Sequence, residues 1–251
     1  MRYASLGSGS RGNGTLIQAG DQLVLLDCGF TIKEVERRIE RLGCGVQDIT
    51  AVLVTHEHAD HLKGVAPLAR KYKLPVYMTP GTFRSRDHGK LPKLHLIEGF
   101  RPFELGDLAV EPVAVPHDAR EPAQFIFSYQ QLRLGVLTDL GNISAHVEES
   151  YRDCDALVLE ANHDPHMLAS GPYPISLKQR VGGAWGHLSN AQAAGFLERV
   201  NLQRLRQLVV AHISQQNNSR ERAEETLSHI VSDIPEVVFA CQDEGFSWMS
   251  L

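Results

Sequence analysis

Residues 55–61 read THEHADH and place three histidines and two acids in seven positions, directly after a short apolar run. A strand end holds binding groups on a rigid frame, so this cluster fixes an edge of the fold at which a site can form. His56 and His58 are two positions apart, and on an extended backbone both imidazoles point to the same side. Asp60 and His61 follow where the chain turns toward a helix. The four side chains can therefore face one point from two directions.

Three further polar residues occupy similar positions along the chain. His117 follows the apolar run LAVEPVAVP, Asp139 follows LRLGVLT, and His212 follows QLVVA. Neutral imidazole together with carboxylate suits zinc, and also manganese or iron. The strand ends therefore predict a metal site built from five histidines and two aspartates: His56, His58, Asp60, His61, His117, Asp139 and His212.

Short apolar and β-branched runs bounded by turn residues predict a series of strands, and amphipathic patterns predict helices between them. The expected strands are 23–26, 51–55, 76–78, 108–115, 124–129, 133–138, 156–160, 207–211 and 236–240. The expected helices are 31–42, 67–72, 189–200 and 220–232, the third opening with Ser189 and Gln192 at capping-box spacing. No linker or repeat interrupts the chain. We expect one α/β (α+β) domain spanning 1–251, in which helices cover sheets.

Composition restricts the class of protein. Apolar residues make up 43% of the chain and charged residues 22%, ordinary values for a globular protein. The first residues lack the apolar region of a signal peptide, no run is long enough to span a membrane, and the four cysteines form no CxxC pair. These features predict a reduced, cytoplasmic protein. The net charge of −5 argues against coating nucleic acid by bulk electrostatics, although basic clusters occur at 84–93 and 199–206.

The segment HEHADH resembles the HxHxDH signature of the metallo-β-lactamase fold, and the resemblance runs over nearly the whole chain. It implies a four-layer αβ/βα sandwich with two divalent metal ions, zinc in the first instance and manganese or iron as alternatives. In this pattern one ion is held by His56, His58, His117 and Asp139, and the other by Asp60, His61, His212 and the shared Asp139. Asp27, in LVLLDCG, would orient a ligand imidazole without binding metal.

Four more stretches narrow the resemblance to one branch of this fold. LGSGSRGN, LEANHD, GHLSN and AHISQQNN are similar to the YycJ/WalJ (VicX) branch of this fold, whose small bacterial members resemble DNA exonucleases. The chain has Asp139 where metallo-β-lactamases proper usually have cysteine, and VPHDA where glyoxalase II enzymes carry a GHTPG-type motif. The resemblance therefore implies hydrolysis of phosphodiester bonds, with DNA as the expected partner and substrate.

The expected chemistry assigns roles to particular side chains. A hydroxide between two cations is a nucleophile at neutral pH, and a histidine is the usual proton donor to a leaving sugar oxygen. His187, just ahead of the helix at 189–200, is the first candidate for this donor, and His163 is the second. Asp60 is counted among the catalytic residues as well as the ligands. A hairpin loop near the start and a late polar turn provide the expected substrate contacts: Ser8, Ser10, Asn13, Asn217 and Asn218.

Two rival functions stay open at this stage. One is a hydrolase of small molecules, either a phosphodiester or a thioester. The other is a metal-containing regulatory or binding protein with little turnover, although such proteins commonly lose ligands and this chain retains all seven.

Overall fold

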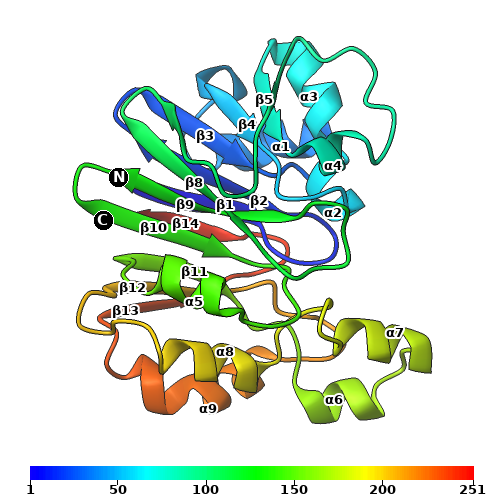
Figure 1. The fold of residues 1–251 in the computed structure, drawn as a ribbon, viewed down its shortest axis with the longest axis vertical. Coiled ribbons are helices and arrows are strands. Elements are labelled where there is room, and N and C mark those ends of the chain that lie inside the picture. The colour runs from blue at the N-terminus through cyan, green and yellow to red at the C-terminus, as the bar shows by residue number, and fades with distance from the viewer. The chain divides into compact units, whose positions relative to one another are not determined.

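The structure, a computed structural model, describes residues 1–251 and divides into two compact units (Figure 1). The first unit comprises Met1–Ala114, Ala119–Gln131 and Cys241–Leu251, and the second comprises Val115–Asp118 and Leu132–Ala240. The single domain spanning 1–251 stays a prediction. No helix combines the length and apolar character that crossing a bilayer requires.

The first unit is built around a mixed sheet in the order β14-β1-β2-β3-β4-β5-β6. Strands β14 to β3 pair antiparallel and β3 to β6 pair parallel. Pairing of β1 with β14 brings the two termini side by side. The first unit also contains an antiparallel meander formed by β7, β8 and β9. The bounds are β1 Arg2–Gly7, β2 Gly14–Ala19, β3 Gln22–Leu26, β4 Ala51–Leu53, β5 Pro75–Met78, β6 Lys93–Leu96, β7 Phe103–Leu105, β8 Leu108–Ala114, β9 Ala123–Tyr129 and β14 Phe246–Ser250.

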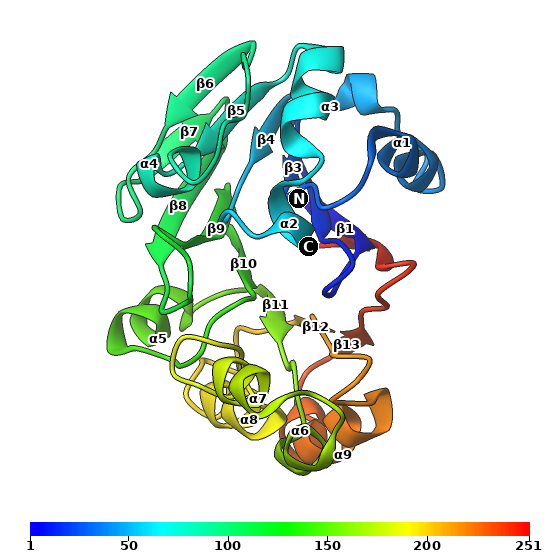
Figure 2. The same ribbon diagram turned by 90° about the vertical axis from the view of Figure 1, so that its right-hand side faces the viewer.

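Helices cover one face of the first sheet. They are α1 Ile32–Glu40, the 3-10 turn η1 Val46–Asp48, α2 Ala59–Leu62, α3 Val65–Tyr72 and α4 Pro80–Phe83. Val35 of α1 and Leu68 of α3 pack into one buried cluster with Val52 of β4, so α1 and α3 lie on the same face (Figure 2). This packing fixes the carboxyl ends of β3 and β4, from which the residues of the predicted site extend.

The second unit contains four parallel strands in the order β13-β12-β11-β10. Their bounds are β10 Leu132–Leu137, β11 Ala156–Glu160, β12 Gln207–Ala211 and β13 Glu236–Phe239. The helices are α5 Ala145–Tyr151, α6 Pro165–Ser170, α7 Ile175–Val181, α8 Asn190–Leu197 and α9 Arg220–Val231, with α8 and α9 side by side (Figure 1). Because parallel strands end at one edge of a sheet, the polar residues that follow β10, β11 and β12 gather there.

Every strand predicted from the sequence is present, with ends that differ by at most two residues. The capping box of Ser189 and Gln192 at the start of α8 is also confirmed. The second predicted helix begins earlier than expected, because α3 starts at Val65 and not at Pro67. The sequence pattern missed the strands with mixed or polar faces and the shortest helices: β1, β2, β6, β7, β14, α2, α4, α5, α6 and α7.

Candidate metal centre

In the first unit a buried carboxylate holds the loop that carries the predicted ligands. Asp27 Oδ2 accepts hydrogen bonds from His61 Nδ1 at 2.8 Å and from Thr55 Oγ1 at 2.9 Å, and Oδ1 accepts from the Thr55 backbone N–H at 2.9 Å. An ionised carboxylate has no proton to give, so the His61 proton lies on Nδ1 and its lone pair on Nε2. Asp27 therefore fixes the ring of His61, and its effect on metal retention stays a prediction.

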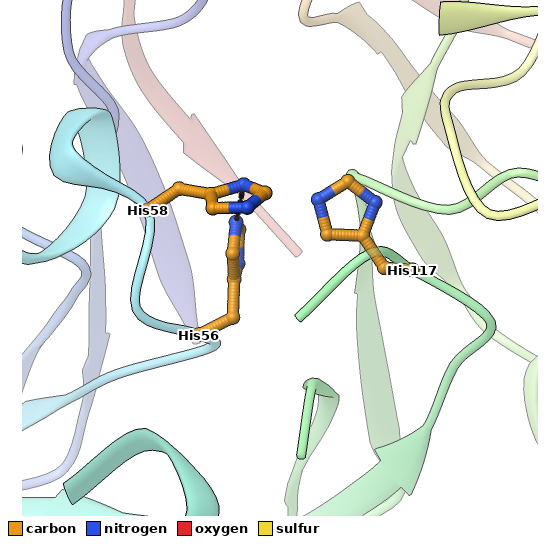
Figure 3. A group of neighbouring side chains, drawn as sticks. All are labelled: His56, His58 and His117. Carbon is orange, nitrogen blue, oxygen red and sulfur yellow. Dashed lines mark hydrogen bonds between the residues drawn. The ribbon is translucent and has the colours of Figure 1, made fainter. Parts of the chain in front are cut away.

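His56 and His58 present their rings to each other at the start of this loop. The His56 Nε2 and His58 Nδ1 atoms are 3.0 Å apart and the rings meet edge-on (Figure 3). Because the Thr55 hydroxyl proton goes to Asp27, Thr55 Oγ1 accepts from His56 Nδ1, 2.9 Å away. The lone pair of His56 is thereby placed on Nε2, against the ring nitrogen of His58. Two such nitrogens at hydrogen-bond distance suit a shared cation.

The loop that carries these ligands packs closely against the backbone of residues 27–29. Asp27 has a φ of 61°, in the left-handed region that non-glycine residues seldom enter. A Cβ atom added at Gly29 would lie 1.8 Å from the Asp60 carbonyl oxygen, so only glycine fits there. Cys28 donates its backbone N–H to the His61 carbonyl at 2.7 Å, and its side chain packs in the core. Burial raises the pKa of the Cys28 thiol to about 12, so it is a packing residue.

In the second unit a different carboxylate, Glu160, organises the predicted residues, and the sequence reasoning missed it. Glu160 Oε1 accepts from His187 Nδ1 at 2.7 Å and from His212 Nδ1 at 3.0 Å. Its Oε2 accepts the backbone N–H groups of Leu140 and Leu188, each at 3.2 Å. All four acceptor positions of a fully buried carboxylate are thus used, which is the condition for keeping such a group charged inside a protein.

Charge in this cluster follows from the same contacts. Burial alone would lower the pKa of His187, but the Glu160 carboxylate beside it raises that pKa to about 9. Burial would raise the pKa of Glu160, but the charge and hydrogen bond of His187 lower it to about 2. Before any metal binds, the pair is therefore a carboxylate with an imidazolium.

The other two predicted ligands of the second unit lie beside this pair. Asp139 Oδ1 is 3.2 Å from His212 Nδ1 and 3.6 Å from His187 Nδ1. His117, the third histidine drawn in Figure 3, has Nδ1 3.0 Å from the Gly186 carbonyl oxygen, which places its lone pair on Nε2. Its ring centroid is 5.3 Å from that of His187. Asp139, His117 and His212 are therefore gathered around His187 within this unit.

Backbone strain marks two of these residues. Asp139 has a φ of 54° and His212 a φ of 53°, both left-handed, and both follow the carboxyl end of a parallel strand. Such conformations cost of order 1–3 kcal/mol and persist only where the surroundings impose them. Here the strained turns direct the side chains toward Glu160 and His187.

The donor set fits divalent metal ions. Four of the five predicted ligand imidazoles have one ring nitrogen held by a carboxylate, hydroxyl or carbonyl oxygen, which sets the tautomer and leaves the lone pair on the other nitrogen: His56, His61, His117 and His212. Metal-binding histidines show this arrangement almost without exception. In the second unit one donor atom of each of Asp139, Glu160, His187 and His212 lies within 4.8 Å of the others, so the predicted ligands Asp139 and His212 sit close together. The residues therefore suit hard or borderline divalent cations.

The five predicted substrate residues have different surroundings. Asn13 lies in the β1–β2 hairpin loop, where its Oδ1 accepts a hydrogen bond from the Gly9 backbone N–H at 2.8 Å. Its Nδ2 lies 3.0 Å from His61 Nε2, so this loop approaches the predicted ligands. Ser8 is buried in that loop and Ser10 is exposed. Asn217 is buried, and neither polar atom of its amide group has a hydrogen-bond partner.

Asn218 requires a correction. Its Nδ2 donates to Ala161 O at 2.9 Å and to Asn190 Oδ1 at 2.8 Å, while its Oδ1 accepts from Asn190 Nδ2 and from Ser219 N, each at 3.0 Å. Every donor and acceptor of the amide is used inside the protein. Asn218 therefore ties β11 to the starts of α8 and α9, and it has no capacity left for a substrate.

The second proton-donor candidate, His163, is less suited to that role than His187. Its side chain is buried, its Nδ1 has no hydrogen-bond partner, and no carboxylate holds its ring. Burial lowers its pKa, so the ring is neutral at pH 7. His187 has both the carboxylate partner and a partly exposed ring, and the geometry favours it.

Asp27→Ala is expected to cost about 10–100-fold in metal affinity or activity, the usual loss when a residue that orients a ligand is removed. The physical reason is that His61 would lose the acceptor that fixes its tautomer. Metal content after dialysis and hydrolysis rate should both be measured, with Asp21→Ala, an exposed aspartate in the β2–β3 turn, as the control. Unchanged retention and rate would make Asp27 only a turn residue.

Glu160→Gln is expected to lower the free energy of unfolding by about 1–3 kcal/mol, because an amide cannot accept all four hydrogen bonds and leaves buried donors unsatisfied. Denaturant titration of the metal-free protein measures this loss independently of activity. Glu149→Gln, at an exposed position of α5, is the control. An unfolding curve that matches the parent's would mean that Glu160 does not hold the histidines together.

Comparison with known proteins finds relatives that cover most of this chain. The family model described as "Beta-lactamase superfamily domain" matches residues 22–213. "Exodeoxyribonuclease YycJ" of Bacillus anthracis is 34% identical over 239 residues, which cover 93% of this chain and 90% of that protein. "Exodeoxyribonuclease WalJ" of Streptococcus pneumoniae is 33% identical over 233 residues, covering 90% of this chain and 87% of that protein.

The solved structures identify the fold. The metallo-β-lactamase fold protein YhfI from Bacillus subtilis matches with a TM-score of 0.73 at 15% identity, covering 99% of this chain and 98% of that one. The predicted fold class is thereby confirmed: two mixed sheets flanked by helices form an αβ/βα sandwich.

Proposed function

Because the chain belongs to the metallo-β-lactamase superfamily of hydrolases, with the YycJ/WalJ proteins as its relatives over most of its length, we propose that it is a dinuclear-metal exonuclease acting on DNA. The observation that carries the proposal is the pairing of His187 with Glu160, whose carboxylate also holds the candidate ligand His212. A sugar alkoxide is a poor leaving group and needs a proton, whereas a thiolate leaves without one. A carboxylate-held imidazole beside a ligand therefore favours phosphodiester over thioester hydrolysis.

The metal assignment follows the superfamily pattern, applied to this sequence. His56, His58, His117 and Asp139 would hold one ion, and Asp60, His61, His212 and the shared Asp139 the other. When bound, two divalent ions, zinc in our proposal, would activate the attacking water and neutralise charge on the phosphate. Asp27 and Glu160 keep the ligand rings in the required tautomer.

His187 moves the proton in this scheme. Its Nδ1 donates to Glu160 Oε1, so the transferable proton lies on Nε2. Glu160 keeps the ring oriented and stabilises its protonated form, which raises the pKa of His187. Asn13, through its contacts with Gly9 and His61, would place the hairpin loop beside the substrate, with Ser8 and Ser10 as donors on the same loop.

A substrate panel tests the proposal against its small-molecule rivals. Metal-loaded protein is incubated with end-labelled DNA, bis-p-nitrophenyl phosphate and an acyl-glutathione. We expect progressive shortening of DNA, slower release of p-nitrophenol, and no thioester hydrolysis. Faster cleavage of the thioester than of either phosphodiester would overturn the assignment, and no turnover on any of the three would favour a regulatory or binding protein.

Binding of DNA is expected to depend weakly on salt compared with large basic proteins. The chain carries a net charge of −5, and log affinity falls with log salt in proportion to the phosphates neutralised, with a slope of about −0.7 per phosphate for single strands. A slope of roughly −2 to −4 is predicted from fluorescence anisotropy across a salt series. A slope near −10, as in large repressors, would contradict this expectation.

A further inference from the structure

One segment of the first unit departs from the acidic character of the chain. Residues 84–101, here called the basic edge, carry five cations and two acids, a net charge of +3 in a chain of net charge −5. All five cations are exposed: Arg84, Arg86, Lys90, Lys93 and Arg101. The segment runs from the end of α4 through β6, which is the edge strand of the first sheet (Figure 2).

Three of these cations have no acidic partner. No carboxylate lies within 4.0 Å of Arg84, Lys90 or Lys93. By contrast, Arg11 pairs with Asp243 at 2.8 Å and Arg37 pairs with Glu34 at 2.9 Å. Arg101 pairs with Glu98 only at 3.8 Å and at an exposed position, where an ion pair contributes little. Cations that the protein leaves unpaired are available to phosphates.

The basic edge reaches the predicted metal-binding loop. Arg86 Nη2 donates to the Glu57 carbonyl oxygen at 2.8 Å, and Glu57 lies between His56 and His58. The Glu57 carboxylate in turn accepts the Arg120 backbone N–H at 2.9 Å. A strand bound along the basic edge would therefore be led toward the residues proposed to hold metal.

Aromatic rings accompany the charges. Phe100 is 74% exposed and stands next to Arg101. On β6, Lys93 and His95 are two positions apart and share a face, where His95 stacks on Tyr77 with ring centroids 4.4 Å apart. Positive side chains that follow a backbone, with an aromatic face on which a base can stack, are the two components of single-strand binding sites.

Protection of an edge strand offers a simpler explanation for lysines on β6, because charge there discourages pairing with other sheets. It accounts for Lys93 alone. Arg84, Arg86 and Lys90 precede the strand, and an exposed phenylalanine works against such protection. The combination therefore calls for a ligand that is both anionic and aromatic.

We propose that the basic edge binds a single strand of nucleic acid, with phosphates on Arg84, Lys90 and Lys93 and a base stacked on Phe100. This inference rests on the proposed nuclease function and names the surface that holds the strand outside the metal centre.

The test measures binding without turnover. Metal-loaded full-length protein is titrated against a fluorescent single-stranded oligonucleotide with phosphorothioate linkages, over a series of salt concentrations. Arg84→Gln/Lys90→Gln/Lys93→Gln should make the salt slope shallower by about 2, since each contact contributes about 0.7. The control is a second triple variant, Lys33→Gln/Arg41→Gln/Lys73→Gln, which removes the same charge from exposed positions in α1, after α1 and after α3. Its salt slope should equal that of the parent.

Phe100 is tested separately. Phe100→Ala should weaken binding roughly 5–150-fold, the range for loss of one stacked base, and Phe100→Trp should retain it. An unchanged slope in the first triple variant, or equal slopes in the two triple variants, would overturn the proposed phosphate track. Equal affinity of Phe100→Ala and the parent would overturn the stacking site. Strand binding without any DNA hydrolysis would instead count against the nuclease function alone, because binding is read independently of cleavage.

Discussion

Asp139→Asn is expected to abolish hydrolysis and to lower metal content at both proposed positions, because Asp139 is the one ligand assigned to both ions. The substitution is nearly isosteric, and asparagine tolerates the left-handed backbone of this residue, whose φ is 54°. The fold should therefore survive, and what is lost is the negative charge of a buried side chain beside His212. Elemental analysis per chain and the rate of DNA degradation measure the two effects.

The matched control is Asp233→Asn, which changes an exposed aspartate after α9. It should keep two ions and the parent rate. If Asp139→Asn also kept two fully occupied ions with normal turnover, the assignment of Asp139 as the shared ligand would be wrong. Loss of one ion with partial activity would contradict sharing as well.

His187→Ala is expected to lose about 10²–10⁴-fold on DNA while both ions stay bound, since general acid catalysis typically contributes that factor. None of the proposed ligands is removed, and Glu160 still accepts from His212 and two backbone N–H groups. The control is His146→Ala, an exposed histidine of α5. Metal content should match the parent in both variants.

Leaving-group chemistry separates proton donation from positioning in this variant. A p-nitrophenyl ester needs little protonation to depart, so the loss on bis-p-nitrophenyl phosphate should be much smaller than the loss on DNA. An equal loss on both substrates would show that His187 positions phosphate. No loss on either would remove it from the mechanism.

The positions of the candidate ligands can be predicted from the sequence because each group follows an apolar strand. Apolar runs such as QLVVA end where parallel strands reach one edge of a sheet, so the strand pattern by itself assigns His212 to that edge. The resemblance to the HxHxDH pattern supplies the pairing of ligands with ions, which strand periodicity cannot give.

Glu160 was missed because its signal is ambiguous. It closes the strand ALVLE, and an acid after four apolar residues looks like the point at which a strand returns to solvent. The structure buries it completely between His187 and His212. The stretch LEANHD, which carries part of the family resemblance, contains the residue that organises the second cluster.

Asn218 was assigned to substrate because its sequence context suggested an exposed residue, whereas the structure buries it. Two asparagines before a helix look like an exposed polar turn, but the structure uses Asn218 to join three elements. Left-handed turns at Asp27, Asp139 and His212 could not be predicted either, because only long-range contacts impose them. Local pattern therefore locates polar residues but does not tell a binding group from a buried structural one.

The central claim, a metal-dependent exonuclease, is tested most directly by comparing linear single-stranded DNA with a covalently closed circle of the same sequence. Metal-loaded protein should shorten the linear strand progressively from an end and leave the circle intact, and the shortening should stop when a chelator removes the ions. Blocking the 5′ or the 3′ end of the linear strand then gives the polarity. Cleavage of the circle at the linear rate, or degradation of linear DNA that continues without metal, would contradict the account.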